Sequence, residues 1–383
     1  MRLSAVTAAS FEPKIPFEDR TWFAWETLLW QSTQRPVLGI ALLLCVVPLS
    51  ILSVPLLPFV SLALLRPPPP PRGIYEVGTS DVQHRLTMDG NPILRLRVFY
   101  PAARAPWALR RKWSSRSWLA PDKSRGRYAT RHAYALPLPS ACLRFLAPYL
   151  GWVLRWARLP KRVLRGAPPA PSATCPEAGT GWPLVVFSHG LYGCAAGYTG
   201  LCAEVASHGS IVVAVEHKDG SAIYTETDDG DRRSYEAPED DHAGRDRQQS
   251  RRAAEVRAVI ASIDDVIAKL TDADGGLSVD SSAVTLIGHS FGASTALRVA
   301  ADLRGGPTRV RAVVASDPWI SGYNVTRHGA ATVPTLALLT QSMMCALSVS
   351  PCTCTARVYC VHALHAACPV RMSGVHTCPV CTS

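Results

Sequence analysis

The segment with the clearest chemical signature is Gly288-His289-Ser290-Phe291-Gly292, a G-x-S-x-G sequence that follows the apolar run 283–287. Residues 293–302 continue with the pattern of a helix, so the serine is expected at a sharp turn between a strand and a helix. Glycines on either side let the strand and the helix pass close to the serine backbone. This context predicts a nucleophilic Ser290 hydroxyl, whereas the alternative is a glycine-rich turn without chemistry.

A serine hydroxyl is a weak nucleophile until a base removes its proton, so the chain should also supply an acid and a histidine. The apolar segment 309–316 is expected to form the next strand, and Asp317 follows it directly. In hydrolases with this motif the acid comes after the serine in the chain, which makes Asp317 the expected acid. The competing interpretation of Asp317 is a turn residue before Pro318.

Backbone donors for an oxyanion should come from an earlier strand of the same sheet. Residues 182–188 have the composition of such a strand and run into His189-Gly190-Leu191-Tyr192-Gly193. We expect the N–H groups of Leu191 and Phe291 to face the carbonyl oxygen of a substrate. His189 is interpreted as a structural histidine and not as the base, because it precedes Ser290 in the chain.

Similarity to a known family lies in three segments, residues 183–191, 206–222 and 288–293. The second segment contains a block that is more diagnostic than the serine motif, namely Glu216, His217, Asp219 and Ser221. Together the segments resemble the platelet-activating factor acetylhydrolase family, which are α/β-hydrolases of the lipoprotein-associated phospholipase A2 type. Weaker similarity in expected strands at 73–78 and 94–101 and in an expected helix at 251–270 extends the resemblance over about residues 72–339.

The resemblance implies an α/β-hydrolase fold, with a mostly parallel central sheet flanked by helices. It also implies calcium-independent hydrolysis of the sn-2 ester of phospholipids through an acyl-enzyme on Ser290, with no metal or organic cofactor. Asp317 would orient the base, and Leu191 and Phe291 would stabilise the oxyanion. A general carboxylesterase or lipase remains an alternative, as does a catalytically incomplete lipid-binding homologue, because a fold does not specify its substrate.

The family pattern stops after Leu339, before the family's histidine is reached. Residues 318–383 contain no aspartate, glutamate or lysine. Seven of the twelve cysteines lie in the same region, at positions 345, 352, 354, 360, 368, 378 and 381. This composition predicts an atypical, irregular and poorly packed tail over residues 343–383 in place of the last strand and helix of a hydrolase.

Three histidines of the tail are candidates for chemistry. His376 follows Ser373-Gly374-Val375 and faintly resembles the family's histidine segment, so it is the expected base. His362 and His365 could instead bind zinc with Cys378 and Cys381, since a C-x-x-C pair supplies two thiolates, but a regular second pair of ligands is absent. Without a histidine near Ser290, the chain would be a hydrolase scaffold with an incomplete triad.

Residues 37–65 carry no charged side chain and are flanked by Arg35 and Arg66. A helix of about 20 residues crosses a hydrocarbon core of about 30 Å, so this segment is expected to anchor the chain in a membrane. Its prolines leave both a kinked span and a shallow hairpin open. The expected organisation is a polar segment 1–36, the anchor 37–65, a stiff polyproline spacer 66–71, a catalytic domain 72–342 and the tail 343–383.

The formal net charge of +11 comes largely from arginines and lysines between residues 66 and 165, interleaved with tryptophan and leucine. Such a surface suits an anionic lipid interface, and no nucleic-acid motif is present. Five tryptophans are expected either in interfacial helices or packed over the sheet: Trp107, Trp113, Trp118, Trp152 and Trp156. The charged segment 225–252 is interpreted as a solvated loop or partly disordered insertion, and no glycine loop for a nucleotide cofactor is found.

Overall fold

The computed structural model describes residues 67–90, 92–104, 118–119, 125–135, 147–171, 181–238, 241–270, 277–319, 333–340 and 356–361. The expected membrane anchor and the histidines at positions 362, 365 and 376 lie outside these residues. Within the described ranges, no helix combines the length and the apolar character needed to cross a membrane.

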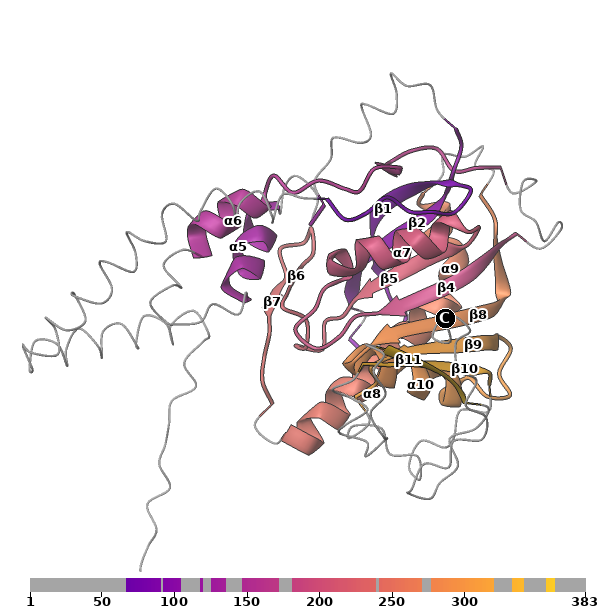
Figure 1. Ribbon diagram of the computed structural model, residues 1–383. Coiled ribbons are helices and arrows are strands. Elements are labelled where there is room, and N and C mark those ends of the chain that lie inside the picture. The colour runs from indigo at the N-terminus through magenta and orange to yellow at the C-terminus, as the bar shows by residue number, and fades with distance from the viewer. Residues whose placement is uncertain are drawn as a thin grey trace, which may run out of the picture. The chain divides into compact units, whose positions relative to one another are not determined.

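A nine-stranded sheet forms the centre of the described part, in the order β11-β10-β9-β8-β4-β5-β2-β1-β3 (Figure 1). Its strands are β1 (Glu76–Arg85), β2 (Ile93–Ala102), β3 (Val163–Arg165), β4 (Trp182–Ser188), β5 (Ile211–Glu216), β8 (Val279–His289), β9 (Arg309–Ser316), β10 (Thr335–Thr340) and β11 (Ala356–Val361). Neighbours from β5 to β10 run parallel, whereas β2 is antiparallel to both β1 and β5. The carboxyl ends of β4, β8 and β9 therefore meet at one edge of the sheet.

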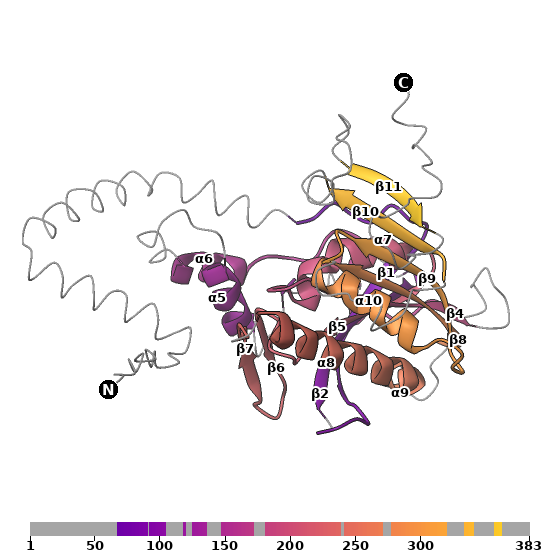
Figure 2. The same cartoon turned by 90° about the horizontal axis from the view of Figure 1, so that it is seen from below.

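Helices cover both faces of the sheet because its central strands are buried on both sides. In β4, Leu184 and Val186 pack in a core with α8 (Asp241–Ala261), α9 (Ile263–Ala268) and α10 (Phe291–Asp302). The alternate residues Val185 and Phe187 pack in a second core with α7 (Thr199–Ser207). Figures 1 and 2 show α7 on one face and the other three helices on the opposite face. This alternation follows from the two-residue repeat of a strand.

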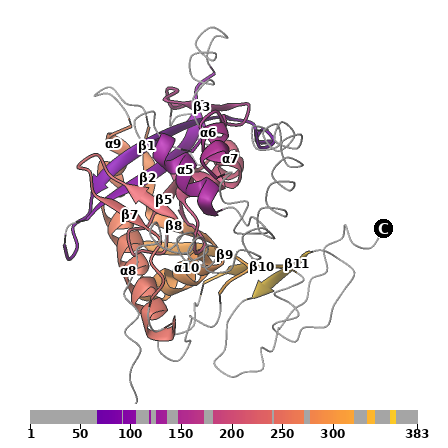
Figure 3. The ribbon, with the colours of Figure 1, turned by 90° about the vertical axis from the view of Figure 1, so that its left-hand side faces the viewer.

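A pair of helices, a hairpin and a 3₁₀ turn lie beside the sheet. Helices α5 (Arg125–Ala135) and α6 (Ala147–Leu154) pack against each other, as Figure 3 shows, and α5 contacts the two-stranded hairpin of β6 (Tyr224–Glu226) and β7 (Arg232–Ser234). A 3₁₀ turn, η4 (Ala195–Tyr198), leads into α7. The predicted mostly parallel sheet flanked by helices is confirmed.

The expectation of a solvated loop or partly disordered insertion over residues 225–252 is wrong for most of the segment. It contains the hairpin β6-β7 and the first half of α8. Gln249 and Arg252 of α8 are buried at 1% and 0% exposure, and Arg252 pairs with Asp219. The composition suggested a solvated segment because charged side chains usually face water. Here the buried polar residues are satisfied by partners elsewhere in the chain.

Part of the tail also departs from expectation. Residues Ala356–Val361 form β11, antiparallel to β10, so the sheet extends beyond the boundary expected at residue 342. The strand contains valine and tyrosine, residues that favour strands, and it pairs with the open side of β10, whose backbone groups otherwise lack strand partners. The tail is therefore not irregular throughout.

Candidate active site

Ser290 lies at the turn between β8 and α10, as the sequence predicts. Its backbone has φ 52° and ψ −119°, in a region that residues with a side chain rarely adopt. Ser290 N–H donates to the Ser316 carbonyl at 2.8 Å, and Trp319 N–H donates to the Ser290 carbonyl at 3.2 Å. The last residue of β9 and the segment that follows it thus hold the serine backbone on both sides.

The two glycines of the motif are required by close backbone contacts. A Cβ atom on Gly288 would stand 2.2 Å from the carbonyl oxygen of Gly292. A Cβ atom on Gly292 would stand 2.1 Å from the carbonyl oxygen of Ser188, at the end of β4. Glycine therefore brings β4, β8 and α10 close together around Ser290.

Asp317 follows β9 directly, with φ 43°, and its N–H donates to the Leu338 carbonyl at 2.7 Å. Its negative charge acts on His289, the residue before Ser290. Burial lowers the pKa of His289, and the charge of Asp317 partly opposes this effect. The predicted nucleophile and acid therefore lie at neighbouring strand ends.

The turn after β4 carries the first predicted oxyanion donor, Leu191. Three N–H groups around it are engaged: Gly190 donates to the Tyr198 hydroxyl at 3.2 Å, Tyr192 to the Ser221 carbonyl at 2.8 Å, and Gly193 to the Gly190 carbonyl at 3.1 Å. Within the described ranges, neither Leu191 N–H nor Phe291 N–H has an acceptor. Two backbone donors thus remain available at this edge of the sheet.

His189 is fully buried, and both of its ring nitrogens contact backbone groups. Nδ1 lies 2.8 Å from the Gly190 carbonyl, and Nε2 accepts the N–H of His217 at 3.3 Å. Burial, followed by the charge of Arg252, holds its pKa well below the ordinary value. A neutral imidazole engaged in this way matches the structural role expected for His189.

A buried polar chain lies beneath the turn, and sequence reasoning did not find it. His217 Nε2 lies 2.8 Å from Ser188 Oγ, and His217 Nδ1 lies 2.8 Å from Glu255 Oε2. Burial raises the pKa of Glu255 to about 7 and lowers that of His217. Ser188 is only 3% exposed and both partners are buried, so this Ser-His-Glu chain supports the fold and is closed to substrate. The polar residues of α8 at three-residue spacing, Gln249, Arg252 and Glu255, are the signal that could have revealed this buried face.

The expected base and the ligands of the alternative zinc site lie outside the described residues. His376, His362, His365 and the cysteine pair at 378 and 381 all belong to residues that the structure leaves undescribed. In the part of the chain that is described, no group of three or more histidine, cysteine or acidic side chains is arranged to hold a metal ion.

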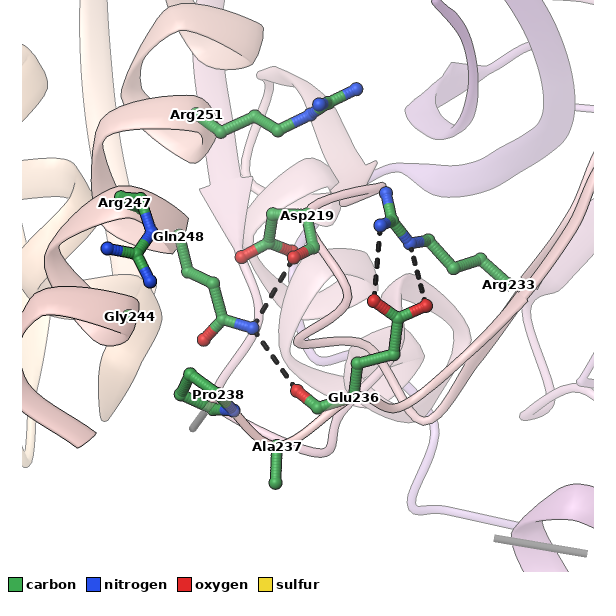
Figure 4. Close-up of a pocket in the computed structure, with 9 residues that line it drawn as sticks. All are labelled: Asp219, Arg233, Glu236, Ala237, Pro238, Gly244, Arg247, Gln248 and Arg251. Atoms are coloured by element: carbon green, nitrogen blue, oxygen red, sulfur yellow. Dashed lines mark hydrogen bonds and ion pairs between the residues drawn. The ribbon is translucent and has the colours of Figure 1, made fainter. Parts of the chain in front are cut away.

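A polar hollow of about 230 Å³ lies between the β6-β7 region and the start of α8 (Figure 4). Its lining includes Arg233, Glu236, Arg247 and Arg251, and Gln248 Nε2 donates to the Glu236 carbonyl at 3.4 Å across it. None of the predicted site residues lines this hollow. It is therefore separate from the nucleophile turn.

A serine at a strained strand-to-helix turn, an acid after the next strand and a sheet covered on both faces define an α/β-hydrolase. A family model described as platelet-activating factor acetylhydrolase, isoform II, matches residues 67–351. The chain belongs to this family.

Known relatives match a shorter part of the chain. The platelet-activating factor acetylhydrolase of Cavia porcellus is 32% identical over 163 residues, which are 38% of this chain and 36% of the relative. That of Gallus gallus is 32% identical over 185 residues, 39% of this chain and 43% of the relative. The matched segments thus span less than half of these relatives. Among solved structures, a ferulic acid esterase from Streptomyces cinnamoneus aligns at 19% identity and a TM-score of 0.44, covering 70% of this chain and 75% of the esterase.

Proposed function

We propose that this protein hydrolyses the sn-2 ester of phospholipids through an acyl-enzyme on Ser290, in a reaction that needs no calcium. The observation that carries the proposal is the strained turn at Ser290, in a chain that belongs to the acetylhydrolase family. In this proposal Asp317 orients the base, which is His376. Leu191 and Phe291 donate their N–H groups to the oxyanion.

The proposed steps follow from the chemistry of these groups. The base takes the proton of Ser290 as Oγ attacks the ester carbonyl, and the negative charge that develops on the carbonyl oxygen is stabilised by the two N–H donors. The protonated base then gives its proton to the departing lysophospholipid oxygen. Water, activated by the same base, releases the acyl group and restores Ser290.

A lipid surface as the site of action is supported by helix α6 and the residues that follow it. Trp152 and Trp156 are 54% and 56% exposed, and their ring centroids lie 6.5 Å apart. The exposed Arg155 and Arg158 lie beside them in the sequence. Exposed indole rings next to arginine suit the boundary between anionic headgroups and acyl chains. Residues 37–65 are proposed to anchor the chain in the same membrane.

The test is labelling of the full chain in its membrane with a fluorescent fluorophosphonate, followed by hydrolysis of phosphatidylcholine with an acetyl or a palmitoyl group at sn-2. Ser290→Ala should abolish labelling and hydrolysis, whereas Ser282→Ala, an exposed serine of the same strand, should change neither. Acetyl release should persist with a calcium chelator.

Labelling that survives Ser290→Ala would contradict the nucleophile. Equal hydrolysis of both lipids would favour a general lipase, and a lack of hydrolysis by the unchanged chain would favour the incomplete homologue.

A further inference from the structure

Arg252 of α8 is a fully buried arginine that contacts both backbone segments carrying the proposed oxyanion donors. We infer that Arg252, assisted by Gln249, is a positioning residue that sets the separation and direction of the Leu191 and Phe291 N–H groups. The inference rests on the proposed function of this site and adds two residues from a helix that supplies none of the reacting groups.

The first contact is with the turn after β4. Arg252 Nη1 donates to the His189 carbonyl at 2.6 Å, two residues before Leu191. Its Nε and Nη2 also donate to Ser221 Oγ, at 2.8 and 2.6 Å. The Ser221 carbonyl in turn accepts the N–H of Tyr192 at 2.8 Å. The guanidinium therefore holds the turn directly on one side of Leu191 and through Ser221 on the other.

The second contact is with the start of α10. The guanidinium carbon of Arg252 lies 4.8 Å from the centre of the Phe291 ring, within the range of a cation–π contact. One turn earlier on α8, Gln249 Nε2 donates to the Phe291 carbonyl at 2.8 Å. Gln249 Oε1 accepts the hydroxyl of Thr295 at 2.9 Å. Helix α8 thus fixes the residue whose N–H is the second proposed donor.

The geometry requires arginine and not lysine. Arg252 donates to His189, Asp219 and Ser221 at once, with the carboxylate of Asp219 at 3.2 Å compensating its buried charge. A planar guanidinium presents five N–H donors in a rigid fork, whereas an ammonium is a single point on a flexible stem. Lysine would keep the charge but lose the link between the two segments.

Small shifts of these donors should matter greatly to turnover. Loss of one oxyanion donor typically costs about 10² to 10³ in kcat, and a displacement of about 1 Å near the reacting atoms costs about 10². Binding of the substrate in its ground state depends little on these donors, because the full negative charge develops only in the transition state.

The experiment compares Arg252→Lys with Arg97→Lys in the full chain. Arg97 is the matched control because it is also buried, at 2% exposure, and donates to a carboxylate, Asp81, and to the Trp118 carbonyl, yet it contacts neither proposed donor segment. Active sites are counted with a fluorophosphonate. Kinetics are then measured with p-nitrophenyl acetate, and affinity with a trifluoromethyl ketone, whose serine adduct carries an oxyanion.

Per active site, Arg252→Lys should lower kcat about 100-fold, with KM changed less than about threefold. The affinity for the trifluoromethyl ketone should also fall about 100-fold. Gln249→Met should show the same pattern at about tenfold. Arg97→Lys should lower the number of folded molecules but leave kcat per active site unchanged. Amide hydrogen exchange of peptides spanning Leu191 and Phe291 should rise in Arg252→Lys but not in Arg97→Lys.

The outcomes separate this inference from the proposed function. An unchanged chain that hydrolyses esters, combined with an Arg252→Lys variant of normal kcat and normal ketone affinity, overturns the inference alone. Equal losses in Arg252→Lys and Arg97→Lys also overturn it, because the effect is then one of general stability. An unchanged chain that neither labels nor hydrolyses overturns the proposed function and the oxyanion role with it.

Discussion

At Ser290 the backbone stores strain that a side chain makes worse. A conformation of this kind costs on the order of 1–3 kcal/mol and persists only where the surroundings enforce it. Here Ser316 and Trp319 enforce it through two backbone hydrogen bonds. Strain at this residue is therefore part of how the hydroxyl is presented.

Replacement of Ser290 by glycine and by alanine should separate strain from chemistry. Both variants lose hydrolysis, but Ser290→Gly should be more stable than Ser290→Ala by about 1 kcal/mol, because glycine tolerates a positive φ. Thermal unfolding measures the difference. At Ser282, whose φ is not positive, the order should reverse. If glycine is also the less stable variant at position 290, the backbone there is not strained.

Asp317 offers a second test at single-residue level, because asparagine tolerates its φ of 43°. Asp317→Asn should therefore fold normally while turnover falls by about 10⁴, as for triad acids elsewhere. Steady-state kinetics per labelled active site measures the loss, and Asp302→Asn on α10 serves as control. Near-normal turnover would show that a residue other than Asp317 is the acid.

Among the elements, strands β1, β2 and β3 are joined by one buried carboxylate. Asp81 of β1 pairs with Arg97 of β2 at 2.7 Å and with Arg165 of β3 at 2.5 Å. Burial alone would raise the pKa of Asp81, but the two arginines outweigh it and hold the pKa well below the ordinary value of 3.8. Asp81 therefore contributes to stability at pH values above its ordinary pKa of 3.8, and this contribution is lost as the pH falls through the lowered pKa of the folded protein.

Asp81→Asn should destabilise the protein by about 3–5 kcal/mol at pH 7, because the buried Arg97 and the partly buried Arg165 lose their counter-charge. The difference from the unchanged chain should shrink as the pH falls below about 4. Urea unfolding at several pH values measures it. Asp264→Asn, at an exposed position of α9, should cost less than about 1 kcal/mol. A pH-independent penalty at position 81 would show that packing, and not charge, sets it.

At the scale of the whole molecule, the proposed base, His376, belongs to a segment distant from Ser290 in the chain. His376→Ala should abolish hydrolysis and slow fluorophosphonate labelling, whereas His365→Ala should leave both intact. The physical reason is that a serine loses its proton only to a base within about 2.6–3.2 Å. Unchanged hydrolysis in His376→Ala rejects this base.

The proposed anchor, residues 37–65, is also tested on the whole chain. The full chain should stay with membranes through a carbonate wash, while a chain that starts at Arg72 should be soluble without detergent. Among the described residues, the shorter chain keeps the hydrogen bond from Arg72 N–H to Glu204 at 2.9 Å and loses the one from Arg162 to the Pro71 carbonyl. Sedimentation followed by immunoblotting measures both. Release of the full chain by carbonate would place residues 37–65 at the membrane surface or exclude them from it.

The sequence by itself determined the features that depend on neighbours in the chain. The glycines around Ser290, the strand before it and the helix after it all follow from local sterics and periodicity, as does the position of Asp317 behind β9. The same reasoning located the turn after β4. Each of these predictions needs only a few consecutive residues.

Only the tertiary structure decided which polar residues are buried and which segments pair. Arg252 lies in a segment rich in charge and is nevertheless fully buried, because His189, Asp219 and Ser221 from the turns after β4 and β5 satisfy its donors. Likewise, β11 forms because β10 presents an open edge to it. Such partners lie far apart in the chain, so composition suggested solvent and irregular structure where the fold supplied hydrogen bonds.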